Sequence, residues 1–247
     1  MSVEVVSLEA PLSLNLRSNY HSLFEIKKEV NSLNLVVEED QEAIVEIVNM
    51  AEFDKIELVI NAEVKENASL KLVMVDFSAS NVDCKLNSHV VNRSKIEVDL
   101  ATVSALSEDK TFDLSVLQTG VDSYSSVKMT GVATDKASLQ LLGTSDVKKG
   151  ARNSYTFQGG TIVNLSQGGH TQVSPILKIS ENEIKAAHAA KLGKVSDETM
   201  FYLMSRGLSK KEAQTLLTIA YLKPVIDEIS DENIKGTLLD YVEKRNF

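Results

Sequence analysis

The chain has 247 residues, with 26 Lys plus Arg against 35 Asp plus Glu, so its formal net charge is −9. Apolar residues at 43% and charged residues at 25% are typical of a folded globular protein and exclude a disordered one. The acidity argues against nucleic acid or an anionic membrane as the main partner. The single cysteine excludes a disulfide framework and a cluster held by four thiolates of one chain.

The N-terminal segment carries no export signal. Residues 1–16 lack the basic stretch followed by an apolar core that marks a signal peptide. No run in the sequence approaches the roughly 18 apolar residues that a membrane-spanning helix needs. Together with the lone cysteine, this predicts a cytoplasmic protein.

Residues 1–180 show the alternation of apolar and polar side chains that is typical of β-strands. Charge is concentrated in the stretch from Glu38 to Glu66, where only Lys55 and Lys65 oppose ten acidic residues. This stretch is either an acidic docking face or the solvated side of strands. The regular alternation of Glu with Ile and Val favours the second interpretation.

A polar turn followed by small residues and a strand recurs in this region. It is found at Glu66–Leu70, Asn92–Ile96 and Asp135–Leu139, with a related turn at Lys148–Arg152. The spacing predicts a repeating unit of about 22–25 residues. Such a unit buries its apolar face only by stacking on its neighbours, which favours a β-solenoid. An all-β sandwich or barrel also has short strands at regular spacing and stays open as an alternative.

Several residues in the strand region invite a functional interpretation. Cys84 shares a strand face with the apolar residues two positions away on either side, which predicts a small buried side chain. His21 has no evident partner and is predicted on the surface or on a strand. The glycine pairs Gly159-Gly160 and Gly168-Gly169 lack the Lys-Ser/Thr of a phosphate loop, so we predict tight corners there.

From residue 196 the pattern becomes helical. Ser196 or Asp197 can cap a first helix, which we expect to end at Arg206-Gly207. Ser209–Glu212 reads as the capping box of a second helix, and Pro224 is expected to end that helix. A last helix is predicted from about Asp231 to Lys244.

The passage Ala186–Val195, followed by Met200–Leu208, resembles the C-terminal region of the SufB/SufD family, the core scaffold proteins of the SUF iron–sulfur cluster assembly machinery. The shared pattern is a His followed by small residues and a Gly, then an aromatic pair and Ser-Arg-Gly. The preceding Ser174–Ile179 and the following Tyr221–Pro224 also fit. The resemblance covers roughly residues 140–230.

This resemblance implies a mainly β fold, a right-handed parallel β-helix followed by a small helical appendage. It predicts a β-helix scaffold core over residues 1–185 and a C-terminal helical ATPase-docking region over residues 186–247. Alanines at 187 and 189 flank His188, which looks more like SufD than SufB, where Glu tends to flank this histidine. The family's usual N-terminal helical region has no counterpart in the sequence, so we expect a short member.

The same resemblance implies a non-enzymatic scaffold that docks an ABC-type ATPase, SufC. It also implies pairing of two β-helical subunits, either with a SufB/SufD-like paralogue or with a second copy. We expect no tightly bound cofactor in the chain alone and a transient Fe–S cluster in the assembled complex. Neither nucleic acid nor a membrane is expected as a partner.

His188 is the strongest candidate for a cluster ligand, because a neutral imidazole can bind iron and the matching His of SufD-like proteins is implicated in cluster assembly at the subunit interface. The alternative is a structural His that hydrogen-bonds within a turn. Cys84 is a weaker candidate for a sulfur-accepting thiol. One thiolate and one imidazole cannot complete a cluster's ligand set, so a partner subunit or an external thiol has to supply the rest.

The docking surface for the ATPase is predicted from the helical region, because aromatic and Met side chains are favoured at interfaces. The alternative is that the same side chains pack the helices onto the solenoid. The predicted docking residues are Met200, Phe201, Tyr202, Met204, Arg206, Leu208, Ala213, Leu216 and Leu217.

A function of another class is a β-solenoid enzyme that acts on carbohydrates. Such a site needs carboxylates clustered for acid and base catalysis. It also uses aromatic platforms, and this chain has no Trp, 6 Tyr and 7 Phe. The sequence therefore favours the scaffold over the enzyme.

Overall fold

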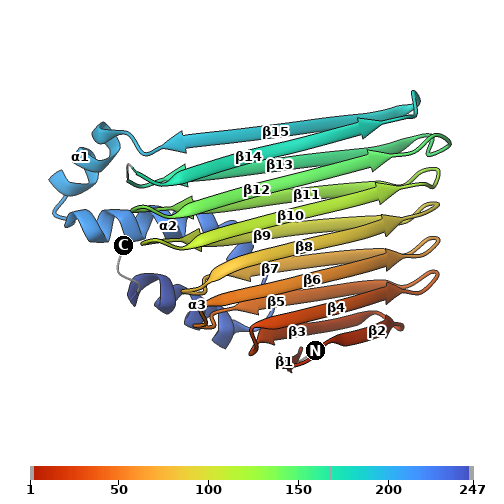
Figure 1. Cartoon of the computed structure of the whole chain (residues 1–247), viewed down its shortest axis with the longest axis horizontal. Coiled ribbons are helices and arrows are strands. Elements are labelled where there is room, and N and C mark those ends of the chain that lie inside the picture. Colours follow the sequence, from red (N-terminus) through yellow and green to blue (C-terminus); the bar gives the residue numbers. More distant parts are fainter. Residues whose placement is uncertain (1–2, 167, 245–247) are drawn as a thin grey trace.

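The computed structural model describes residues 3–166 and 168–244, where strands are followed by helices (Figure 1). The strands are β1 (Glu4–Leu8), β2 (Leu12–Leu16), β3 (Tyr20–Ile26), β4 (Val30–Val37), β5 (Glu42–Asn49), β6 (Lys55–Val64), β7 (Ser69–Asp76), β8 (Asn81–Val90), β9 (Lys95–Ser104), β10 (Asp109–Gln118), β11 (Tyr124–Ala133), β12 (Ser138–Val147), β13 (Ser154–Asn164), β14 (His170–Ile179) and β15 (Ile184–Lys194). The helices are α1 (Asp197–Ser205), α2 (Lys210–Ile226) and α3 (Glu232–Lys244). None of these helices is long and apolar enough to cross a membrane.

The strands form two parallel sheets that face each other. The odd-numbered strands make one sheet and the even-numbered strands make the other, each in chain order. Consecutive strands therefore alternate between the sheets, and each rung contributes one strand to each of them. This arrangement confirms the predicted β-solenoid and helical tail, and it removes the sandwich and the barrel.

The rungs lengthen along the chain, and most of them are longer than the sequence repeat predicted. Glu4 of β1 pairs with Ser22, whereas near the other end Ser138 of β12 pairs with His170, which lies much further along the chain. Strand length grows in parallel, from 5 residues in β1 to 11 in β13 and β15. The predicted repeat length was too short because it combined the turns before β7 and β9, which belong to one sheet, with the turn before β12, which belongs to the other.

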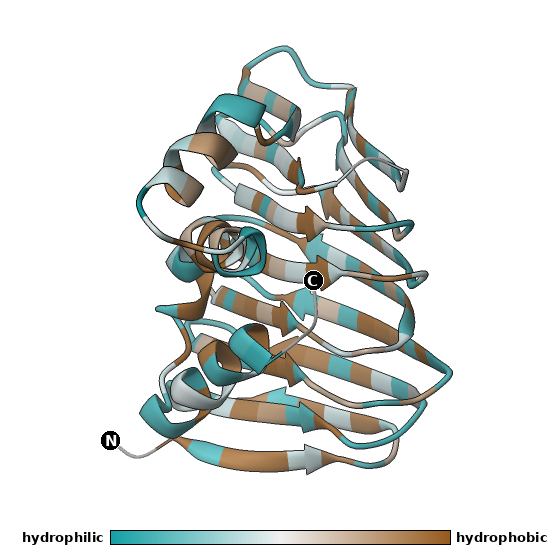
Figure 2. Ribbon diagram, turned by 90° about the vertical axis from the view of Figure 1, so that its left-hand side faces the viewer, coloured by the Kyte–Doolittle hydropathy of each residue, from teal (hydrophilic) through white to brown (hydrophobic). Residues whose placement is uncertain are grey.

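The space between the sheets is filled by apolar side chains at alternate positions of each strand. In β6 every second residue from Ile56 to Val64 is buried, while Glu57 and Glu63 between them are exposed. Figure 2 shows this alternation as brown and teal bands along the strands. These exposed glutamates belong to the acidic stretch and lie on the solvated side of a strand, as predicted, whereas Glu46 of the same stretch is buried. Each fully buried Leu or Ile contributes about 1.5–3 kcal/mol to stability.

The corners of the solenoid use the left-handed backbone region. Asn67, Arg93 and Asp135 have φ of 56°, 53° and 58° and lie in three of the predicted polar turns. Gly150 has φ of 98° in the fourth. Asn and Asp adopt this conformation more readily than most residues, so the polar turns do mark corners.

The predicted corner at Gly159-Gly160 was wrong, because both glycines lie inside β13. A Cβ atom on Gly160 would come within 2.5 Å of Cγ1 of Val173 on β14. The glycine therefore allows a close approach between the two sheets, which is the other common use of glycine in a strand. Gly168, with φ of 123°, does lie in a loop between strands.

The helices pack on the outer face of the odd-numbered sheet, along one side of the stack of strands in Figure 2. A second apolar cluster joins sheet residues such as Val73 and Val103 to Leu222 of α2 and Leu238 of α3. Ser196 caps α1. The capping box expected at the start of the second helix is present.

The end of α2 differs from the prediction. Pro224 lies inside the helix, which continues to Ile226. A proline removes one backbone donor and strains the preceding turn, but the helix continues only briefly beyond it. The tertiary packing of Val225 and Ile226 into the second apolar cluster outweighs this local cost.

A buried carboxylate anchors the helical region to the sheet. Glu46 of β5 is 0% exposed, accepts a hydrogen bond from Nε2 of His21 at 2.6 Å, and accepts another from the backbone N–H of Ser230 at 2.9 Å. Nearby, Nζ of Lys71 lies 2.7 Å from Glu228, which raises the pKa of the lysine. His21 therefore has a partner that the sequence did not reveal.

The predicted boundary between residues 185 and 186 falls inside β15. This last strand of the odd-numbered sheet runs from Ile184 to Lys194, and the first helix begins only at Asp197. The residues of the family-like passage around His188 therefore belong to the solenoid and not to the helical region.

Candidate functional site

His188 lies in the middle of β15, at the end of the odd-numbered sheet. It pairs in register with Gln158 of β13, whose side chain is buried inside the solenoid. Side chains in register point to the same face of a parallel sheet, so His188 also faces the interior side. Its side chain is nevertheless exposed, because β15 is the last strand of its sheet in the described part of the chain.

His188 is therefore not a turn residue. Its ring has no hydrogen-bond partner among residues 3–166 and 168–244. The alternative, a structural His that hydrogen-bonds within a turn, is therefore wrong, because His188 lies in a strand.

The surroundings of His188 form the open end of the solenoid, which consists of the interior-facing side chains of β14 and β15. These two strands lie at the top of Figure 1, each with a neighbour in its own sheet on one side only. Alanines at 186 and 190 flank the histidine on its own face, and Val173 and Pro175 lie on the facing strand. Leu192 is 55% exposed and Ile179 is 40% exposed. The open end is thus an apolar surface with one imidazole near its centre.

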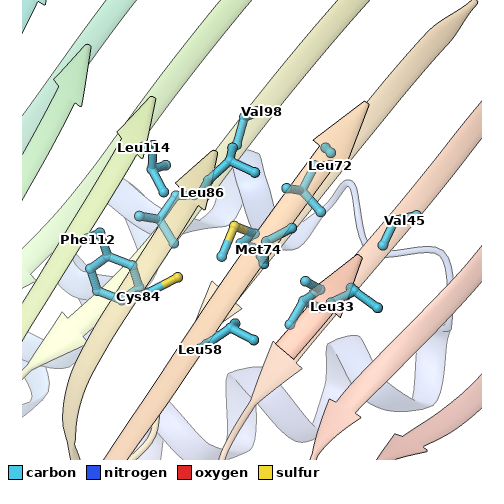
Figure 3. Close-up of a cluster of buried hydrophobic side chains, with 14 of the residues drawn as sticks. Leu33, Val45, Leu58, Leu72, Met74, Cys84, Leu86, Val98, Phe112 and Leu114 are labelled. Carbon is cyan, nitrogen blue, oxygen red and sulfur yellow. The ribbon is translucent and has the colours of Figure 1, made fainter. Parts of the chain in front are cut away.

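Cys84 lies deep in the core, as the sequence predicted for a small buried side chain. It is 1% exposed and is surrounded by Leu58, Leu86 and Phe112 (Figure 3). Burial, together with the negative charge of Asp76, strongly raises the pKa of the thiol. A thiol that stays protonated is a poor nucleophile and a poor metal ligand.

The structure does not bring Cys84 and His188 together. Cys84 is in register with Phe112, then Leu141, then Val173 of β14, which places it three strand spacings below the open end. At about 4.8 Å per spacing this distance is about 14 Å. In the described residues no group of three or more His, Cys, Asp or Glu side chains could hold a metal ion. Any cluster at His188 would need further ligands.

The predicted docking residues divide into an exposed and a packed group. Phe201 is 74% exposed, Tyr202 56%, Met204 46% and Leu216 47%. Arg206 is also exposed and stacks on the ring of Tyr202 at 5.3 Å. These exposed residues of the α1–α2 region are called here the helical patch. Exposed apolar side chains of this kind often mark an interaction site.

The other predicted docking residues face inward. Ala213 is 0% exposed, while Met200 and Leu217 pack against the apolar cluster between helices and sheet. Leu208 is half-buried. Ala213 and Leu216 lie on different faces of α2, because its buried face includes Ala213 and the polar residues Gln214 and Thr218, whereas Leu216 is exposed. Tyr221, at 36% exposed, is an aromatic surface residue that the prediction missed.

The helical patch and the histidine strand are directly connected. Only Val195 and Ser196 separate the end of β15 from the start of α1. Val195 is buried among the helices, and its backbone N–H donates to the carbonyl of Asn164 on β13 at 3.1 Å. The chain therefore passes from the open end to the helical patch without a flexible linker.

A buried ion pair inside the solenoid was not predicted. Nζ of Lys110, on β10, lies 2.7 Å from Oδ2 of Asp76 and donates to the carbonyl of Ser78 at 2.7 Å. Asn49 and Thr102 also donate to the carboxylate of Asp76, at 2.6 and 3.1 Å. The two charged residues lie far apart in sequence, on β7 and β10, so only the stacking of rungs reveals the pair.

Comparison with known protein families identifies the family of this chain. The family model described as "SUF system FeS cluster assembly, SufBD core domain" matches residues 5–221. The chain belongs to the SufBD core-domain family. The match includes almost the entire solenoid, so the SufB/SufD resemblance of the C-terminal passage extends through the upstream strands of this SufBD chain.

Curated SufBD relatives agree with this assignment. The iron–sulfur cluster assembly protein SufD of Bacillus subtilis is 31% identical over 138 residues, which is 56% of this chain and 32% of the relative. SufD of Escherichia coli is 32% identical over 84 residues, 33% of this chain and 20% of the relative. A SufBD family protein of Mycobacterium tuberculosis is 26% identical over 136 residues, 54% of this chain and 16% of the relative. The matched parts therefore span about a third or less of these relatives, and two of them carry the name SufD.

The carbohydrate-enzyme alternative finds no support in a wide surface groove of the described residues. This groove has a volume of about 660 Å³, crosses the outer face of the even-numbered sheet and contains the carboxylates Glu63 and Asp146. The register places three strand spacings between them, through His89 and Leu117, which is about 14 Å. Glycosidase carboxylates lie about 5–9.5 Å apart.

Proposed function

We propose that this chain is a scaffold subunit of the SUF machinery, on which nascent iron–sulfur clusters are built, and that it is not itself an enzyme. The observation that carries the proposal is an exposed, unpartnered imidazole on the end strand of a SufBD-family solenoid. Iron and sulfide are the substrates of the site. Because His188 stands alone, the other ligands come from a partner subunit or an external thiol.

The open end pairs with a second β-helix, either a SufB/SufD-type paralogue or another copy of this chain. In support, an end strand presents unpaired backbone N–H and C=O groups on its outer edge, which readily extend a sheet across an interface. The exposed Leu192 and Ile179 add apolar area on the same end. Pairing here would bring the partner's ligands to His188.

The helical patch docks an ABC-type ATPase of the SufC kind. Its exposed Phe201, Tyr202 and Met204 supply the aromatic and Met side chains that interfaces favour. ATP-driven closure of two ATPase subunits would move the paired scaffolds and open the site at His188. The short connection between β15 and α1 gives such a movement a direct path to the ligand.

The test is a reconstitution of this chain with an ABC-type ATPase of the SufC kind and the remaining SUF subunits. The ATPase should co-purify with the wild-type chain, and Phe201→Ser with Tyr202→Ser should abolish this. Leu106→Ser is the matched control, because Leu106 is 60% exposed but lies in a solenoid corner. Failure of the wild-type chain to bind the ATPase or to change its ATP hydrolysis would contradict the docking role.

His188→Ala tests the cluster site in the same reconstitution. The variant should fold normally, since the ring is exposed and unpartnered, and it should lower the yield of assembled cluster. His170→Ala is the matched control, because His170 is an exposed histidine at the start of the neighbouring end strand β14. An unchanged cluster yield with His188→Ala would remove this residue from the site.

A further inference from the structure

The solenoid interior just below the open end is polar, and its polar side chains are linked to one another. Oγ of Ser125 donates to Oε1 of Gln118 at 2.8 Å and lies 2.8 Å from Oγ1 of Thr156. Thr156 in turn donates to Oγ of Ser145 at 2.7 Å. Pairing of this kind is what buried polar groups require.

Gln158 departs from this pattern. It lies on β13, shortly after Thr156, and is 0% exposed. Neither Oε1 nor Nε2 of its carboxamide has a hydrogen-bond partner in the described residues. A buried polar group that is left unpaired destabilises the fold, so the presence of two such atoms on one side chain calls for a compensating use.

Space for this side chain is maintained by a glycine on the facing sheet. A Cβ atom on Gly143 of β12 would lie 2.4 Å from Oε1 of Gln158. Gly143 is in register with Pro175 of β14, and Gln158 is in register with His188 of β15. Gln158 therefore lies one layer below the open end, with its backbone directly under that of the candidate ligand and its carboxamide reaching across the interior to Gly143.

We propose that Gln158 is a positioning residue for His188. Oε1 of the carboxamide accepts a hydrogen bond from one ring N–H and so selects the tautomer whose other nitrogen presents its lone pair at the open end. Adjacent strands are about 4.8 Å apart, so rotation about the terminal side-chain bonds brings the amide to the ring. A partner of this kind fixes the tautomer and orientation of metal-binding histidines in general. The inference deepens the proposed function and rests on His188 being a ligand.

The test reads the tautomer of His188 in the full chain without iron. The 15N shifts of both ring nitrogens are measured at one pH where the ring is neutral, and the His188 signals among the 4 histidines are identified by their loss in His188→Ala. One net hydrogen bond shifts a two-state equilibrium by about fivefold. Gln158→Leu should change the tautomer ratio by about this factor. Gln158→Glu should retain the wild-type ratio, since a carboxylate oxygen accepts the same N–H.

Thr156→Val is the matched control, because it removes a buried polar group from the same strand at a position in register with Ala186 and not with His188. Should Gln158→Leu fail to fold, Gln158→Asn takes its place, because the shorter amide cannot reach the ring. Equal tautomer ratios in wild type and Gln158→Leu, or an equal shift with Thr156→Val, would overturn the inference. The readout needs no cluster, so this failure is distinct from an unchanged cluster yield with His188→Ala.

Discussion

The buried Lys110–Asp76 pair offers a sharp test of how the solenoid is held together. In Lys110→Met the carboxylate of Asp76 keeps its hydrogen bonds from Asn49, Ser78 and Thr102 but loses its countercharge. Removing one partner of a buried ion pair costs about 3–5 kcal/mol. For a chain of this size each kcal/mol lowers Tm by about 2–4 °C, so we expect a decrease of about 6–20 °C.

The free energy of unfolding is measured by urea denaturation followed by far-UV circular dichroism. The double variant Asp76→Asn with Lys110→Met should recover more than half of the loss, because it removes the charge of Asp76 and keeps an acceptor oxygen for Asn49 and Ser78. The carboxylate of Glu108, 3.7 Å from Nζ of Lys110, is the same in both variants. Lys55→Met is the control, since its ion pair with Glu57 is exposed and should contribute little. A loss below about 1 kcal/mol for Lys110→Met would refute the reasoning.

Three further outcomes follow from individual contacts. Burial raises the pKa of the Cys84 thiol, so a thiol reagent at pH 8 should label it only as fast as the chain unfolds. The backbone N–H of Ser209 donates to the Glu212 carboxylate and lowers its pKa, so the contribution of this bond is complete above the unfolded-state pKa and is lost as pH falls through the lowered one. Glu212→Gln should abolish this pH dependence of Tm. Burial and Glu228 raise the pKa of Asp99, so Glu228→Gln should lower that pKa in an NMR titration.

The fold class could be predicted from the sequence because strand alternation and corner chemistry are local properties. The rung length could not, because it depends on which strands lie in the same sheet. Ser69 begins β7 of the odd-numbered sheet, whereas Ser138 begins β12 of the even-numbered one. Turns before odd-numbered and even-numbered strands look alike in sequence. The number of residues between a turn of one kind and a turn of the other is not a whole number of rungs.

The candidate site was predicted in part. The sequence pattern identified His188, but the Ala-rich stretch around it has low strand propensity, and its β-structure depends on pairing with β13. Lys110 and His21 were missed for the same reason. Their partners, Asp76 and Glu46, lie one rung or more away in sequence, so no local sequence pattern predicts these pairs.

The way β15 is attached has a mechanical consequence. β15 is joined to β13 by register pairs along its whole length, from Ile184 to Lys194, so a pull on α1 along the axis of β15 loads this pairing in shear. Under such a shear load the ladder hydrogen bonds share the force, whereas a perpendicular pull would break them one at a time. The strand that carries His188 can therefore transmit tension as a rigid rod without detaching from the sheet.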